Sequence, residues 1–235
     1  MNGLLLALAF LTRLPVPQPS ATTAEFAASM RWFPAAGLVI GPMIAAAGWL
    51  GAQGDPWIGA LLATLVWVGL TGALHLDGLG DIADAAGAAH GDRTRMMAVL
   101  TDPHLGSFGV TAIALQLAAK LVLLHGCIDR GLWPGLALIP FAARIGPLAW
   151  TLLLPPLHDG LGARFHGAVR PRDIGLWLAA LTVAGWFAPG LLAAFILIPL
   201  WAWWIMARIG GISGDGHGAG IETVETGLLL ALLLA

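Results

Sequence analysis

Long apolar stretches are the feature that most constrains the fold of this 235-residue chain. A helix needs about 20 apolar residues to cross the hydrocarbon core of a membrane. Six stretches approach this length, at residues 33–52, 57–76, 107–125, 132–154, 174–188 and 190–207. Two shorter apolar segments, 2–12 and 224–235, are expected to be half-spans or interfacial helices. We therefore expect an all-α, polytopic integral membrane protein with about six transmembrane helices plus short apolar N- and C-terminal helices.

The composition supports this class of protein and excludes others. Charged residues make up 10% of the chain and hydrophobic residues 58%, whereas about a quarter of a soluble domain is charged. The net charge of −2 argues against a nucleic-acid partner, and the single Cys127 excludes an internal disulfide. No repeat divides the chain, so residues 1–235 are interpreted as a single transmembrane catalytic domain in a lipid bilayer. The dipeptide Pro189-Gly190 fits either a tight turn between two helices or a kink in one long helix.

Short and long polar segments alternate along the chain. Counting crossings places the long segments, near 13–32, 77–106, 155–173 and 208–223, on the same side of the membrane. These segments contain eight arginines: Arg13, Arg31, Arg93, Arg95, Arg164, Arg170, Arg172 and Arg208. The positive-inside rule makes that side cytoplasmic. Most of the acidic residues lie in the same segments, so the working face is expected to be cytoplasmic.

The most informative motif covers residues 74–84 and contains Asp77, Asp81 and Asp84 at positions i, i+4 and i+7. This spacing places three carboxylates on one face of a helix. Neighbouring carboxylates repel one another, and Mg²⁺, which binds a few carboxylates together with substrate phosphates, removes the conflict. Gly78 leaves the helix surface bare, so a bulky ligand can approach the backbone. A solvated acidic turn is the alternative, and it fits poorly because the motif continues an apolar span.

A second cluster lies near the C-terminus in a glycine-rich run that includes Gly211 and Gly214. Such a run, where it enters a helix, offers free backbone N–H groups to a phosphate. Asp215 lies in the run and Glu222 follows seven residues later. If the segment is helical, Glu222 and Glu225 share a face. The alternative is a flexible loop with a capping aspartate.

The sequence leaves the roles of several other polar residues open. Asp102 either completes a metal shell or caps the helix that follows it. Arg144 lies inside an apolar span, where an unpaired charge is costly, whereas Lys120 is expected to snorkel to the interface. His75 is interpreted as an interfacial histidine, and His217 as a histidine in a glycine-rich loop.

Five ordered motifs in this chain resemble those of the cobalamin synthase family, the adenosylcobinamide-GDP ribazoletransferases. The motifs lie at 10–17, 31–34 with Gly37 and Gly41, 74–84, Asp102 with Gly106 and Gly109, and 210–215 with Gly218, Ala219 and Glu222. The likeness covers nearly the whole chain. Two departures are Ser213, where the family has Thr, and His217, where an apolar residue is usual.

The resemblance implies the last assembly step of vitamin B12 synthesis in the bacterial cytoplasmic (inner) membrane, with Mg²⁺ as cofactor. A hydroxyl of α-ribazole, or of its 5′-phosphate, attacks adenosylcobinamide-GDP and GMP leaves. The expected metal ligands are Asp77, Asp81 and Asp84, and the expected catalytic residues are these three and Glu222 as general base. The expected substrate-binding residues are Arg13, Arg31, Gly78, Asp102, Gly106, Gly211, Gly214 and Asp215. A homo-oligomer, or a complex with neighbouring pathway enzymes, is an expectation by analogy alone.

Two other classes of function remain as alternatives. A CDP-alcohol phosphotransferase or a membrane prenyltransferase also joins a carboxylate cluster to a diphosphate substrate, commonly with two separated aspartate motifs in place of one. A transporter is expected to place ionisable groups near the bilayer midplane, whereas here most of them lie toward one surface. Arg144 and Lys120 are the residues that favour a transporter.

Overall fold

The computed structural model describes residues 2–17, 20–88 and 92–235, and over these residues the chain is helical with no β-strand. Five helical segments are long and apolar enough to cross a membrane, or six if one bent pair of helices is counted as a span. Large apolar side chains on the outer helices, such as Leu65, Leu115, Val183 and Ile196, are exposed. Lipid rather than water suits such a surface. The predicted all-α, polytopic membrane fold is therefore confirmed.

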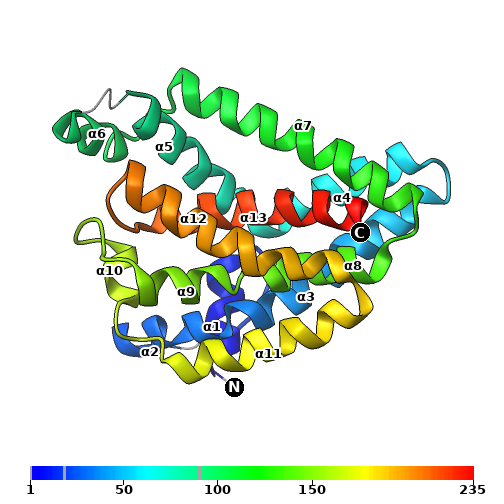
Figure 1. Ribbon diagram of the computed structural model, residues 1–235, viewed down its shortest axis with the longest axis horizontal. Helices are drawn as coiled ribbons and strands as arrows, with labels where there is room; N and C mark the ends of the chain where they lie inside the picture. The colour runs from blue at the N-terminus through cyan, green and yellow to red at the C-terminus, as the bar shows by residue number, and fades with distance from the viewer. Residues whose placement is uncertain (1, 18–19, 89–91) are drawn as a thin grey trace.

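The helices formed by the long apolar stretches and the C-terminal helix run roughly along the longest axis of the molecule (Figure 1). They are α3 (Phe33–Ala52), α4 (Pro56–Thr71), α7 (Ser107–Asp129), α8 (Trp133–Ala143), α9 (Gly146–Leu153), α11 (Pro171–Phe187), α12 (Ala194–Arg208) and α13 (Gly214–Leu234). Shorter elements complete the fold: α1 (Asn2–Leu11), α2 (Thr23–Ala28), α6 (Arg93–Leu100), α10 (Leu161–Phe165) and the 3₁₀-helices η1 (Ser29–Trp32) and η2 (Pro189–Ala193). The turn between α11 and η2 shows that Pro189-Gly190 separates two helices.

Two of the predicted spans are broken. The expected span 57–76 ends early, because Gly72 and Ala73 both adopt a left-handed conformation, with φ of 59° and 58°. This conformation stops a helix, and the chain turns by 85° into α5 (Leu74–Ala88). The expected span 132–154 is interrupted at Arg144 between α8 and α9. Both breaks lie beside the polar groups described below.

The C-terminal helix is longer than the sequence pattern predicted. The apolar segment 224–235 is the second half of α13, which begins in the glycine-rich run at Gly214. The hydroxyl of Ser213 accepts a hydrogen bond from the N–H of Gly216 at 3.0 Å and caps the first turn. The glycines form a helix rather than a loop because they are buried against other elements, where small residues let helices pack closely.

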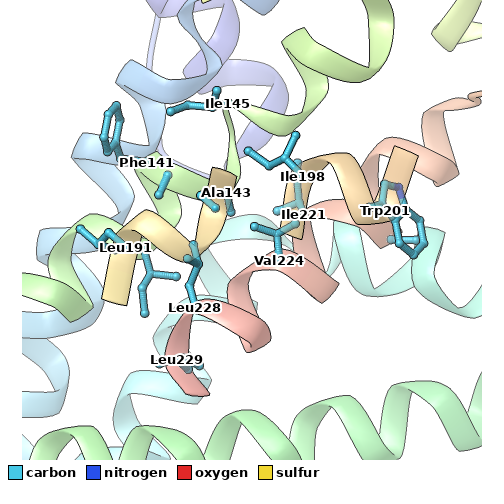
Figure 2. Close-up of a cluster of buried hydrophobic side chains, with 14 of the residues drawn as sticks. Phe141, Ala143, Ile145, Leu191, Ile198, Trp201, Ile221, Val224, Leu228 and Leu229 are labelled. Carbon is cyan, nitrogen blue, oxygen red and sulfur yellow. The ribbon is translucent and has the colours of Figure 1, made fainter. Parts of the chain in front are cut away.

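Helix α13 forms the centre of the core. Figure 2 shows apolar side chains of α8, η2, α12 and α13 gathered around one another, with Ile221 and Val224 of α13 beside Ile198 of α12. Near the C-terminus, residues 131–132, 134–135 and 187–190 line one cleft with Leu232 and Ala235. Helices α2, α6 and α10 lie toward the opposite end (Figure 1, left). The short and the long connections are thus separated, as the alternating pattern predicted.

Candidate active site

Helices α5 and α13 cross with almost no side chain between them. A Cβ atom added to Gly78 would lie 2.8 Å from the carbonyl oxygen and 2.9 Å from the Cα of Asp215. One turn further along α13, a Cβ on Gly218 would lie 3.3 Å from the Cα of His75. Gly78 therefore permits direct backbone contact between the helices, and this contact brings the first turn of α13 next to the aspartates of α5.

Three carboxylates of the two motifs converge at this crossing. Asp77 is exposed, and Asp81 and Asp215 are half-buried. Asp81 lies within electrostatic range of Asp215, Asp77 and Asp84. None of the three forms an ion pair with a lysine or arginine in the part of the chain that the structure describes. The cluster therefore carries unbalanced negative charge, which a cation would stabilise.

The donor chemistry of this cluster fits Mg²⁺ bound together with a diphosphate. Carboxylate oxygens are the hard ligands that Mg²⁺ prefers, and the ion usually takes only one or two of them and completes its shell with water and substrate phosphates. Within residues 2–17, 20–88 and 92–235, no group of three Asp, Glu, His or Cys side chains is arranged to hold a metal by itself.

Asp84 has a different environment from the other two aspartates of its motif. It is buried, and its oxygens accept hydrogen bonds from the N–H groups of Gly106 at 2.7 Å and Gly109 at 2.9 Å. Gly106 is the N-cap residue of α7 and lacks a capping side chain of its own. Asp84 therefore caps α7 from outside the helix and fixes α7 against α5.

The structure does not bring Asp102 into the cluster. Its side chain is exposed in the loop before α7, where its Oδ1 accepts the N–H of His104 at 3.0 Å and lies 2.6 Å from the Nδ1 of that residue. The hydrogen bond with the His104 side chain lowers the pKa of Asp102. Since α7 begins at Ser107 behind Gly106, Asp102 closes a turn ahead of the helix rather than capping the helix itself.

The two arginines expected to bind phosphate lie at the ends of connections. The exposed Arg13 donates its backbone N–H to the oxygen of Leu70 at 2.7 Å, and its side chain packs against Gly72 at the turn between α4 and α5. The half-buried Arg31 donates to the carbonyl oxygens of Ala28 at 3.0 Å and Ala168 at 3.3 Å. Arg13 therefore lies close in space to the start of α5, although it is far from it in the sequence, whereas Arg31 ties η1 to the segment after α10.

Of the two C-terminal glycines, only Gly214 borders the site. It is the first residue of α13 and lines a cavity beside Asp77 and Asp215. Gly211 is buried against the backbone of the loop after α9, where a Cβ atom would lie 2.9 Å from the oxygen of Pro155. Because Gly211 has no side chain, the loop before α13 can pack against the loop after α9. The two loops form an isolated parallel β-bridge between Ile212 and Pro156.

The cavity itself has a volume of about 160 Å³ and is mostly apolar. Its polar residues are Asp77, Asp215, His75 and His217. The sequence analysis named both histidines but did not place either among the expected site residues. The available signal was their position, since His75 precedes Asp77 by two residues and His217 follows Asp215 by two.

A buried ion network lies deeper in the bundle. Lys120 contacts Glu222 at 2.7 Å and Glu225 at 2.8 Å, and Arg144 contacts Glu225 at 2.9 Å. Gln116 donates a further hydrogen bond to Glu222 at 2.7 Å. Lys120 is only 2% exposed, so the expectation that it snorkels to the interface was wrong, because two carboxylates on the shared face of α13 hold it inside. This network, rather than the cavity wall, contains the Glu222 that was expected to act as general base.

The crossing of α5 and α13 gives a direct prediction. Gly78→Ala is expected to lower kcat/KM by about 10–100-fold, because the new methyl group forces the helices apart and displaces Asp215 relative to Asp77. Gly175→Ala in α11 is the matched control, since a Cβ there meets nothing within 4 Å, and its activity is expected to stay within about twofold. Equal activities of the two variants would show that the close crossing is unimportant for the reaction.

The comparisons with known proteins agree on one family. The family model described as cobalamin-5-phosphate synthase matches residues 3–233. A protein named adenosylcobinamide-GDP ribazoletransferase from Novosphingobium aromaticivorans is 59% identical over 100% of this chain and 97% of its own length. Proteins of the same name from Thiobacillus denitrificans and Laribacter hongkongensis are each 50% identical, over 98% and 100% of this chain and 94% and 98% of their own lengths. No solved structure matches the chain. The chain therefore belongs to the cobalamin-5-phosphate synthase family of transferases.

Proposed function

We propose that this protein joins adenosylcobinamide-GDP to α-ribazole, or to its 5′-phosphate, and releases GMP. This reaction is the last assembly step of vitamin B12 synthesis. The observation that carries the proposal is the convergence of Asp77, Asp81 and Asp215 beside a cavity, in a chain whose full-length relatives are named for this activity.

The bond changes balance without a further reactant. A ribose hydroxyl of the acceptor forms a new P–O bond to the phosphorus attached to the cobinamide side. The bond from that phosphorus to the bridging oxygen breaks, and the bridging oxygen leaves as part of GMP. The hydroxyl proton passes to a base on the protein. Catalysis of such a transfer depends on positioning and on the stabilisation of charge.

The carboxylates of α5 suit the binding of the diphosphate donor, adenosylcobinamide-GDP. In the proposal, Asp77 and Asp81 hold Mg²⁺ together with the diphosphate, while Asp84 keeps α7 in place behind them. Bound Mg²⁺ supplies positive charge to the phosphate oxygens. Arg13, at the turn that leads into α5, is proposed to pair with the phosphate of the leaving GMP, because a guanidinium binds phosphate oxygens in a bidentate way.

We assign the proton acceptor to Asp215. It borders the cavity, whereas Glu222 lies seven residues, or about 10 Å, further along α13 and is bonded to Lys120 and Gln116. A base must lie within hydrogen-bond reach of the proton that it takes. The working face is proposed to be the cytoplasmic face of the bacterial inner membrane, because the arginine-rich connections lie on that side.

The proposed reaction depends on Mg²⁺ and forms its two products, GMP and the cobalamin product, in equal amounts. Purified protein in detergent, mixed with adenosylcobinamide-GDP and α-ribazole, is expected to release GMP and form the cobalamin product in a 1:1 ratio when Mg²⁺ is present. EDTA in excess is expected to reduce both by at least about 10²-fold. Chromatography of the two products measures this. Release of GMP without cobalamin, or turnover that is unaffected by EDTA, would contradict the proposal.

A further inference from the structure

The cavity beside Asp77 has one wall that phosphoryl transfer does not require. Phe10, Phe33 and Phe165 form this wall, and the ring of Phe33 lies 5.9 Å from each of the other two, centroid to centroid. An apolar cavity of about 150 Å³ is large enough to bind benzene, and this cavity measures about 160 Å³. It therefore has the size and the lining to enclose an aromatic ring next to the carboxylates.

Two buried histidines lie in the wall of the same cavity. His75 is 2% exposed and His217 is 6% exposed. In the described part of the chain, both ring nitrogens of His75 and the Nδ1 of His217 lack a hydrogen-bond partner. The ring of His217 stacks on Trp150, with centroids 6.0 Å apart, and its Nε2 lies 3.3 Å from the hydroxyl of Thr151. Buried polar atoms are nearly always hydrogen-bonded in native proteins, so these nitrogens indicate a ligand that carries both polar and aromatic parts.

We propose that this cavity binds the acceptor nucleoside, with its aromatic base against the three phenylalanines and its polar groups bonded to His75 and His217. The inference rests on the proposed function and names the place of its second substrate. A neutral imidazole offers one donor and one acceptor, which suits a ribose hydroxyl and a ring nitrogen. The ribose then faces Asp215, while the donor diphosphate occupies the open side at Asp77 and Asp81.

The test separates binding of the two substrates. His217→Phe keeps a ring against Trp150 and removes both nitrogens. The KM for α-ribazole is expected to rise by about 10–100-fold, while the KM for adenosylcobinamide-GDP stays within about twofold. His217→Asn, whose amide replaces the polar group near Nδ1, is expected to recover part of the loss. His125→Phe is the matched control, because His125 also stacks on a tryptophan, Trp57, with ring centroids 3.9 Å apart. His125 lies near the C-terminal end of α7 and does not line the cavity.

A second measurement uses the unaltered protein. In equilibrium dialysis, α-ribazole is expected to bind at least about 100-fold more tightly than methyl riboside, which lacks the base. Equal binding of the two compounds, or an unchanged KM for α-ribazole in His217→Phe, would overturn the cavity assignment and leave the proposed function standing. If the protein makes no product at all, the proposed function fails, and the dialysis still decides whether the cavity binds an aromatic nucleoside.

Discussion

Replacing Asp81 with asparagine is expected to abolish turnover and, at the same time, to stabilise the metal-free protein. The carboxylate faces Asp77, Asp84 and Asp215, so its removal relieves repulsion between like charges. Activity is expected to fall by at least about 10²–10³-fold, the usual cost of removing a group that stabilises transition-state charge. The melting temperature in EDTA is expected to rise by roughly 2–4 °C, which corresponds to ~1 kcal/mol in a chain of this length.

Asp77→Asn is expected to lose activity to the same extent, and Asp129→Asn serves as the control. Asp129 is exposed and ends α7, so its replacement is expected to change neither activity nor melting temperature appreciably. Initial rates with Mg²⁺ and thermal unfolding in EDTA measure the two effects separately. Near-normal turnover in Asp77→Asn or Asp81→Asn would exclude these carboxylates from the chemistry. A loss of activity together with a lower melting temperature would instead indicate damage to the fold.

The largest effect on stability is expected for the buried ion network. Glu225→Leu removes the partner of Arg144, and both side chains are fully buried. A buried charge without its partner costs about 3–5 kcal/mol. The double variant Arg144→Met/Glu225→Leu removes both charges and is therefore expected to be more stable than Glu225→Leu alone. Thermal unfolding in one detergent, applied to both variants and the parent protein, measures the difference.

An exposed ion pair provides the control for this prediction. Arg172 lies 4.0 Å from Asp173, and its side chain is 73% exposed. Arg172→Met is therefore expected to cost less than about 1 kcal/mol. If Glu225→Leu were no less stable than Arg172→Met, the network would not hold α13 in place. If the double variant were the least stable of all, the charges would contribute through packing rather than through their pairing.

The helical membrane fold could be predicted because hydropathy reports directly on what each helix faces. The limits of α3 and the separate helices α11 and α12 follow from the apolar pattern and from Pro189-Gly190. The breaks at Gly72 and Arg144 could not be predicted, since apolar residues continue on both sides of each. The full length of α13 was also hidden, because glycine disfavours a helix unless tertiary packing requires a small residue.

The candidate site could be predicted only in part, because helical periodicity indicates neighbours within one helix but not contacts between helices. The spacing of Asp77 and Asp81 follows from helical periodicity, and the structure places both at the crossing with α13. The separate environment of Asp84 depends on the start of α7, which is 22 residues further along the chain. The pairing of Lys120 with Glu222 joins residues from two distant helices. No local pattern reports such contacts, so only the fold reveals which charges face the cavity and which neutralise one another.

Binding of Mn²⁺ in place of Mg²⁺ tests the central claim most directly. The electron paramagnetic resonance of Mn²⁺ detects phosphorus nuclei close to the ion. With adenosylcobinamide-GDP present, the parent protein is expected to bind Mn²⁺ with a coupling to phosphorus, and Asp77→Asn and Asp81→Asn are expected to lose the protein-bound signal. A protein-bound signal of equal strength in the parent protein and both variants, or one without coupling to phosphorus, would contradict a shared site for the aspartates, the metal and the diphosphate.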